Sequence, residues 1–231
     1  MENAGALAQN RESVAAVIPA YNEEKHIGDV VRRTLRELKN VLVVDDGSGD
    51  NTADRAREAG AEVVVHAHNR GKGETIKTGF RHWLERQMEF VIILDADGQH
   101  RPEEIARFLN AASAGNAKMF VGNRMSDLSS MPFIRRAVNH WMSSRISAVC
   151  GQTIPDTQCG FRMLHRDLIP NFLAGADRFE YETEMLILAS RNGDRIESVP
   201  ISTVYSDEVS SIHPVRDTLR FFILMHRYKK R

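Results

Sequence analysis

Short apolar runs alternate with segments of helical periodicity through the first half of the chain. A run from Val14 to Ile18 closes at Pro19, and apolar residues then recur at helical spacing between Ile27 and Leu38. Further strands are predicted at 41–44, 63–65, 90–94 and 118–121, with helices at 51–59, from Gly73 to about Arg86, and at 102–112. Strands separated by helices predict an α/β fold, a mostly parallel sheet with helices on both faces.

The regular alternation fades after Arg124. The pattern there predicts a helix at 131–150, a loop at 151–162, a helix at 181–191 and a last strand at 195–199. We interpret 13–216 as one domain, in which 13–124 is a nucleotide-binding half and 125–216 an acceptor half. Residues 1–12 are polar and small, which predicts a loose arm.

The last segment, 217–231, is predicted to be an apolar helix with a basic end. Its apolar residues lie nearly all round a helix: Leu219, Phe221, Phe222, Ile223, Leu224 and Met225, followed by Arg227, Lys229, Lys230 and Arg231. A solvated basic tail explains this pattern. Docking on anionic lipid, at about 1 kcal/mol per basic residue near the surface, or on a membrane-protein partner explains it equally well.

Composition and charge describe an ordinary globular protein. Hydrophobic residues make up 42% and charged residues 27% of the 231 positions, and 31 basic residues balance 31 acidic ones, so nothing favours nucleic acid as a partner. No apolar run reaches the roughly 20 residues of a membrane-spanning helix. Cys150 and Cys159 have no zinc or redox spacing and no signal peptide precedes them, so we expect reduced thiols in a cytoplasmic protein.

Two carboxylates one residue apart follow the predicted strand at 90–94. Five apolar residues in a row predict a strand buried on both faces, and Asp95 and Asp97 stand where it ends. Carboxylate oxygens bind divalent cations, and ligands of open α/β sheets bind at this end of the strands. A solvated turn is the alternative. Because Pro102 and two acids begin a helix soon afterwards, the pair lies in a strand-to-helix crossover, which favours a metal site.

The turn after the first strand lacks the glycine-rich fingerprint of dinucleotide-binding folds and the phosphate loop of ATPases. It offers instead Tyr21, suited to stacking on a base, and Glu23, which can accept hydrogen bonds from a base or ribose. A helix start capped by Asn22 would explain the same residues. Both interpretations can hold together.

Polar residues follow the other predicted strands too. Asp45 and Asp46 offer acceptors for a base or ribose, or simply form a good turn. The segment 71–73, Gly-Lys-Gly, could hold phosphate at a helix N-terminus or form a tight loop. Arg124 is a candidate for neutralising a diphosphate, or a surface arginine.

Together these motifs resemble the family 2 glycosyltransferases with a GT-A fold, and within them the polyprenyl-phosphate (dolichyl-phosphate) mannose and glucose synthases. The resemblance runs from about Ser13 to Asp217. Six ordered motifs carry it: Pro-Ala-Tyr-Asn-Glu at 19–23, Val-Asp-Asp-Gly-Ser at 44–48, Asn-Arg-Gly-Lys-Gly at 69–73, Asp-Ala-Asp-Gly-Gln-His at 95–100, Gly-Asn-Arg at 122–124 and Asp-Thr-Gln-Cys-Gly-Phe-Arg at 156–162.

The resemblance implies a role for each matching position. Positions expected to bind the sugar nucleotide are Pro19, Ala20, Tyr21, Glu23, Val44, Asp46, Lys72, Asp95, Ala96 and Gln99. A magnesium or manganese ion is expected on Asp95, Asp97 and Gln99, and the expected catalytic residues are Asp97, Arg124 and, as a base, Glu182. Gln158–Phe161 matches the segment beside the transferred sugar and the acceptor.

The sequence departs from this group after its last strand. The mannose synthases carry an arginine and a lysine in that loop, whereas Thr203–Ser211 here has neither, and His213 or Arg216 would have to substitute. Many relatives continue into membrane helices, whereas this sequence ends at Arg231. Both departures bear on the acceptor more than on the reaction.

The predicted function is inverting transfer of a sugar from a GDP-mannose or UDP-glucose type donor to a polyprenyl or dolichyl phosphate, in the cytoplasm or at the cytoplasmic face of the membrane. One alternative is a hydroxyl acceptor in cell-envelope polysaccharide or glycolipid synthesis, and another is a nucleotide-sugar-binding protein without turnover. A sugar nucleotidyltransferase is disfavoured, because it would need a glycine-rich basic turn where residues 19–24 stand.

Overall fold

The computed structural model describes residues 11–126, 133–178, 180–202 and 228. One seven-stranded sheet runs through them, in the order β3-β2-β1-β4-β6-β5-β7. Its strands are β1 (Val14–Ala20), β2 (Asn40–Asp45), β3 (Glu62–Val65), β4 (Phe90–Ile93), β5 (Met119–Asn123), β6 (Arg162–His165) and β7 (Ile196–Pro200). Only β6 runs antiparallel to its neighbours in this sheet, β4 and β5. The α/β class and the mostly parallel sheet are therefore confirmed.

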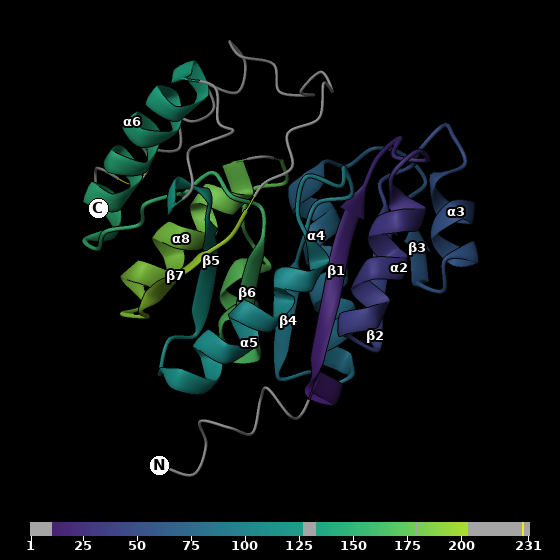
Figure 1. Cartoon of the computed structure of the whole chain (residues 1–231), viewed down its shortest axis with the longest axis horizontal. Coiled ribbons are helices and arrows are strands. Elements are labelled where there is room, and N and C mark those ends of the chain that lie inside the picture. The colour runs from purple at the N-terminus through teal and green to yellow at the C-terminus, as the bar shows by residue number, and fades with distance from the viewer. Residues whose placement is uncertain (1–10, 127–132, 179, 203–227, 229–231) are drawn as a thin grey trace.

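Helices lie on both faces of the sheet (Figure 1). Their bounds are α2 (Ile27–Glu37), α3 (Thr52–Glu58), α4 (Lys72–Glu85), α5 (Ile105–Ala114), α6 (Phe133–Cys150), α7 (Ile169–Phe172) and α8 (Glu180–Arg191). Helix α4 packs on β1 and β2 and contacts α7 and α8, whereas α2 packs on α3 and on the short helix η2 (Pro102–Glu104) that leads into α5. Because β1, β2, β3 and β4 run parallel to one another, they end at the same end of the sheet, towards which the arrow of β1 points in Figure 1.

Tight packing of α4 on β1 fixes the centre of the core. All residues of β1 are buried, and the indole of Trp83 in α4 donates a hydrogen bond to the carbonyl of Ala16 at 3.1 Å. Gly79 lets the helix approach: a Cβ atom there would lie 2.5 Å from Cγ1 of Val17. Because α4 begins at Lys72, this contact also fixes the position of Lys72 at the end of the sheet where the parallel strands end.

The structure corrects three expectations about the elements. The sequence pattern predicts a loop over 151–162, but Arg162 begins β6, a strand that the pattern does not predict. Asn22 does not cap a helix, because α2 begins only at Ile27; Asn22 adopts a positive φ of 57° and accepts a hydrogen bond from the amide of Gly49. The strand predicted at 195–199 spans Ile196–Pro200 instead.

Most of both ends of the chain lies outside the described residues. Of the predicted arm, Arg11–Ser13 forms a short 3-10 helix, and Arg11 forms an ion pair with Glu37 at 2.8 Å. Of the predicted C-terminal helix at 217–231, only Tyr228 is described, and the loop at Thr203–Ser211 lies outside with His213 and Arg216. No helix in the described ranges combines the length and apolarity that crossing a bilayer requires.

Replacing Gly79 with alanine should lower the free energy of unfolding by about 1–3 kcal/mol, because the added methyl group overlaps Val17 and must push α4 away from β1. Urea denaturation followed by circular dichroism measures this. Gly49→Ala is the matched control, since nothing lies within 4 Å of a Cβ atom there, and it should change stability by less than about 0.5 kcal/mol. Equal effects of the two substitutions would contradict the proposed packing constraint.

Candidate active site

Four loops that follow parallel strands meet at one end of the sheet. They follow β1, β2, β4 and β5, and they carry Tyr21, Asp46, Asp95 and Arg124 respectively. The sheet register aligns the last residues of β1 and β2, Ala20 and Asp45, as direct partners. The residues predicted from separate motifs therefore gather at the carboxyl ends of the strands, where open α/β sheets bind ligands.

Asp95 is held between Lys72 and His100. Its Oδ1 lies 2.7 Å from Nζ of Lys72 and its Oδ2 lies 3.5 Å from Nε2 of His100. Burial by itself would raise the pKa of Asp95, but the charge of Lys72 and the contact with His100 hold that pKa well below its usual range. Asp95 therefore stays ionised.

Asp97 has the opposite environment. Burial and the neighbouring negative charge of Asp95 raise the pKa of Asp97, and the backbone amide of Gln99 donates to its Oδ1 at 3.0 Å. In the described part of the chain, no lysine, arginine or histidine forms an ion pair with it. Two close carboxylates, one lacking a cationic partner, fit a divalent cation that would relieve their repulsion. Asp95 and Asp97 could hold such an ion; of Gln99, the third expected ligand, the structure shows the backbone amide bound to Asp97.

Lys72 joins the acid pair to α8. Its Nζ lies 2.7 Å from Asp95 and 3.1 Å from Oε2 of Glu182 in the first turn of α8. Burial would lower the pKa of Lys72, but the two carboxylates raise it above its ordinary value. The other carboxylate oxygen of Glu182, Oε1, is buried without a hydrogen-bond partner among the described residues. One oxygen of Glu182 is thus used by Lys72 and the other is left for a further donor.

Asp46 has less freedom than its predicted role suggests. Its carboxylate accepts hydrogen bonds from the backbone amides of Arg70 at 2.9 Å and Gly71 at 2.7 Å, and His66 contacts it at 2.8 Å. The side chain is only 4% exposed. Asp46 therefore shapes the loop that leads to Lys72, and contact with a ribose would require a rearrangement of this network.

The turn after β1 presents backbone and one exposed ring. The side chain of Tyr21 is 48% exposed, which suits stacking on a base, whereas Pro19, Ala20 and Val44 are buried in the sheet. The backbone amide of Glu23 donates to the hydroxyl of Thr52 at 2.8 Å, which joins this turn to α3. The buried residues can face a donor only through their backbone.

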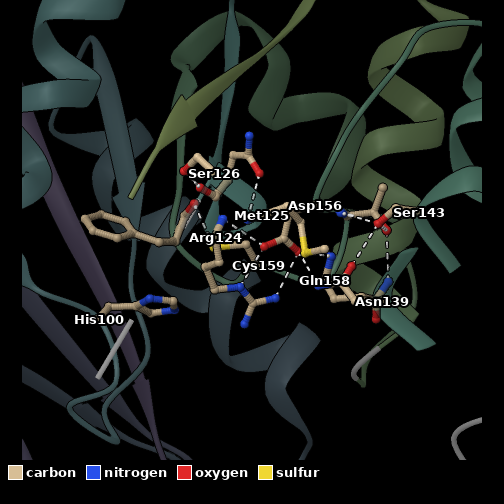
Figure 2. A network of polar contacts seen from close by, with 12 residues as sticks. His100, Arg124, Met125, Ser126, Asn139, Ser143, Asp156, Gln158 and Cys159 are labelled. Atoms are coloured by element: carbon tan, nitrogen blue, oxygen red, sulfur yellow. Dashed lines mark hydrogen bonds and ion pairs between the residues drawn. The ribbon is translucent and has the colours of Figure 1, made fainter. Parts of the chain in front are cut away.

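Arg124 is fixed by a buried carboxylate, as Figure 2 shows. Its Nε and Nη2 donate to the two oxygens of Asp156 at 2.7 and 2.9 Å, and Asp156 is fully buried. The amide of Asn139, in α6, donates to the same carboxylate at 2.9 Å. Arg124 therefore lies at the expected strand end, but two of its donors are already used. No sequence pattern assigns this role to Asp156, although it stands first in the motif at 156–162.

The segment 158–161 lies against the acid pair. A Cβ atom on Gly160 would be 2.5 Å from Oδ2 of Asp95, so only glycine permits this approach. Arg162 fixes the segment from below: it is fully buried and donates hydrogen bonds to the carbonyls of Thr157, Cys159 and Glu182. Hydrophobic periodicity does not predict this function of Arg162. Arg162 thus holds both the segment 158–161 and Glu182 in place beside Asp95.

Relatives of known function share most of this chain's length. It is 30% identical over 214 residues to a UDP-N-acetylglucosamine–dolichyl-phosphate N-acetylglucosaminyltransferase of Methanococcus voltae, with 83% of this chain and 85% of the relative covered. It is 31% identical over 206 residues to an undecaprenyl-phosphate mannosyltransferase of Micrococcus luteus, with 83% of each chain covered.

A solved structure shares the fold. Glucosyl-3-phosphoglycerate synthase from Mycobacterium tuberculosis, crystallised with Mn²⁺, UDP and phosphoglyceric acid, matches with a TM-score of 0.71 at 20% identity, over 94% of this chain and 77% of the other. The family model described as "Glycosyl transferase family 2" matches residues 15–172, more than half of the chain. The protein therefore belongs to glycosyl transferase family 2 and is a glycosyltransferase.

Proposed function

We propose that the protein transfers a sugar, with inversion, from a nucleotide diphosphate sugar to a polyprenyl or dolichyl phosphate. The observation that carries this proposal is the acid pair at the end of β4, with Asp95 ionised beside Lys72 and Asp97 without a cationic partner in the described residues. Two relatives whose names specify dolichyl-phosphate and undecaprenyl-phosphate transferases support the choice of acceptor.

The donor would lie across the carboxyl ends of β1, β2 and β4. In this arrangement Tyr21 stacks on the base, and backbone groups of Pro19, Ala20 and Val44 face it. Glu23 and Asp46 lie on the ribose side, Asp46 mainly through the loop that it shapes. These contacts do not distinguish a GDP-mannose from a UDP-glucose type donor, so the proposal includes both.

The diphosphate would lie beside Asp95, Ala96, Asp97 and Gln99. Mg²⁺ or Mn²⁺ on the acid pair would supply a positive charge that stabilises the departing nucleotide diphosphate. The chain itself contributes the ammonium of Lys72, and Asp156 holds the guanidinium of Arg124 in a fixed orientation. Preorganised charges of this kind stabilise charge that develops in the transition state.

A phosphate acceptor makes a general base unnecessary. The second pKa of a phosphate monoester is about 6, so its oxygen is already anionic at neutral pH and can attack the anomeric carbon directly. Glu182 would then serve to hold Lys72 at 3.1 Å and to order the acceptor side of the site. This role agrees with its ion pair.

One observation favours the alternative of a hydroxyl acceptor. Oε1 of Glu182 is buried and has no hydrogen-bond partner in the ranges that the structure describes. A hydroxyl group that donated to this oxygen would satisfy it and could lose its proton to it. In that case Glu182 is a catalytic base, as the family resemblance implies.

The site of action would be peripheral, at the cytoplasmic face of the membrane, where a lipid phosphate is available. The C-terminal segment 217–231, expected to contact membrane or a membrane protein, lies outside the described residues apart from Tyr228. Its part in binding stays a prediction.

Replacing Asp97 with alanine should lower the rate of sugar transfer about a hundredfold or more, because the acid pair loses half of its charge. The assay measures release of nucleotide from a panel of UDP- and GDP-sugars with Mg²⁺ or Mn²⁺, with and without a short-chain polyprenyl phosphate. Asp29→Ala removes an exposed carboxylate on α2 and should leave the rate unchanged. Turnover that is independent of the lipid phosphate, or that survives in Asp97→Ala and in EDTA, would refute the proposed reaction.

Replacing Glu182 with glutamine distinguishes the two acceptors. With a phosphate acceptor the rate should fall less than tenfold, because glutamine keeps the shape and no proton has to be removed. A loss of a hundredfold or more, with unchanged binding of the donor, would instead support a hydroxyl acceptor with Glu182 as its base. Donor binding is measured separately by calorimetry, so that damage to the Lys72 contact is not mistaken for loss of a base.

A further inference from the structure

Tyr228, three residues before the last residue of the sequence, contacts α8. Its hydroxyl donates a hydrogen bond to Oε1 of Glu184 at 2.7 Å. The guanidinium carbon of Arg191 lies 4.6 Å from the centre of the Tyr228 ring, within the range of a cation–π interaction, and the same guanidinium donates to the Tyr228 carbonyl. These contacts join residues that are 44 and 37 positions apart in the sequence. Tyr228 therefore links the end of the chain to α8.

Glu184 passes this contact on to the loop that precedes α8. Its side chain is buried in a residue that is only 3% exposed, and its second oxygen, Oε2, accepts a hydrogen bond from the backbone amide of Ala176 at 2.5 Å. Burial of a carboxylate is costly unless hydrogen bonds compensate for the lost water, and hydrogen bonds to a charged group are strong. One carboxylate thus binds the Tyr228 hydroxyl on one side and the loop on the other.

The same loop packs tightly against the start of α4. A Cβ atom on Gly71 would lie 2.6 Å from the carbonyl oxygen of Asp177, and one on Gly73 would lie 2.6 Å from the carbonyl oxygen of Ala176. Only glycine permits so close an approach at either position. The two glycines are the neighbours of Lys72 in the sequence, so the loop fixes the backbone on both sides of Lys72.

Hydrogen bonds reinforce this packing. The backbone amide of Glu74 donates to the carbonyl of Asp177 at 3.1 Å. The ammonium of Lys77, which is only 4% exposed, donates to the carbonyl of Gly175 at 3.0 Å and to the carboxylate of Asp177 at 2.5 Å. A displacement of the loop would therefore displace the first turn of α4.

We infer that Tyr228 is a positioning residue for sugar transfer, which fixes the ammonium of Lys72 through Glu184. Glu182, the carboxylate that pairs with Lys72 at 3.1 Å, lies two residues before Glu184 in α8, so the same contact also orients the partner of Lys72. The link from Tyr228 to α4 stands without any assumption about the substrates. Its effect on transfer rests on the proposed role of Lys72 beside the donor diphosphate.

Hydrogen exchange, followed by mass spectrometry on the full chain, tests the link. Tyr228→Phe keeps the ring over Arg191 and removes only the hydroxyl donor. We expect the amide hydrogens of Ala176 and Glu74 to exchange about fivefold faster, because one hydrogen bond that holds the loop is lost. Peptides from β1 and α5 should exchange as they do in the unmodified chain.

Two arginine variants form a matched pair. Arg191→Gln removes the cation from the Tyr228 ring and the donor to its carbonyl, so it should accelerate exchange in the same two regions. Arg195→Gln removes an exposed arginine four residues further on, and it should leave exchange there unchanged. The pair separates the contact with Tyr228 from a general effect of lost positive charge.

Steady-state kinetics test the positioning role. Tyr228→Phe should lower kcat about fivefold and change KM for the donor less than about twofold, because the ammonium of Lys72 acts on charge that develops as the diphosphate departs. In a Lys72→Met background, Tyr228→Phe should have no further effect, since its action passes through Lys72. Each rate is corrected for the folded fraction, which circular dichroism measures.

Three results would overturn the inference. Exchange at Ala176 and Glu74 could be unchanged in Tyr228→Phe; exchange could rise across the whole sheet, which would reduce Tyr228 to a contribution to global stability; or the loss in kcat could be as large in the Lys72→Met background. Absence of lipid-dependent turnover in the unmodified chain would instead refute the proposed reaction, and the exchange rates would still decide whether Tyr228 holds the start of α4.

Discussion

The site depends on a partly buried chain of charges, Asp95–Lys72–Glu182. Each of these groups would be costly to bury alone, and the low dielectric that makes it costly also strengthens the ion pairs between them. Lys72 begins α4, Asp95 follows β4 and Glu182 lies in the first turn of α8, so the charge chain links three elements that are far apart in the sequence. A cation on the acid pair would share Asp95 with an ammonium group that is already in place. The position of α4 on β1 is therefore a condition for the electrostatics of the donor site.

Two other carboxylates organise loops by the same physical means. Asp46 accepts hydrogen bonds from the amides of Arg70 and Gly71, and Asp156 accepts them from the amides of Arg124 and Gln158. A carboxylate that receives backbone N–H groups satisfies donors that no helix or strand can satisfy, and charge-assisted hydrogen bonds are stronger than neutral ones. Asp46 thereby positions the start of α4, and Asp156 positions the Arg124 side chain. These residues shape the site even where they do not touch a substrate.

The first half of the fold could be predicted from the sequence because apolar runs and the polar residues that end them indicate the same strands there. The runs at 90–94 and 41–44 are apolar, and each ends in acidic residues that the structure places at the carboxyl end of the sheet. Strand β6 escaped prediction because it is four residues long and begins with an arginine. Arg162 is nevertheless fully buried, since three backbone carbonyls accept its hydrogen bonds. Hydrophobic patterning cannot anticipate a charge that is buried because distant parts of the chain satisfy it.

The same limit applied to the candidate site. The motifs placed acidic and basic residues at the strand ends, but they could not distinguish a side chain that meets a ligand from one that holds a loop, as Asp46 and Arg124 show. Helix α6 shows how an orientation can be hidden as well. It turns Asn139 and Ser143 inward beside Ile146, and Phe133 and Trp141 outward, so polar side chains share its buried side and aromatic ones lie on its exposed side. Hydrophobic periodicity predicts such a helix, but it also predicts that the aromatic side faces the core, which is not the orientation observed. The hydrogen bonds around Asp156 determine the orientation of α6. Leaving the buried carboxylate without the Asn139 amide would cost more free energy than leaving an aromatic ring exposed.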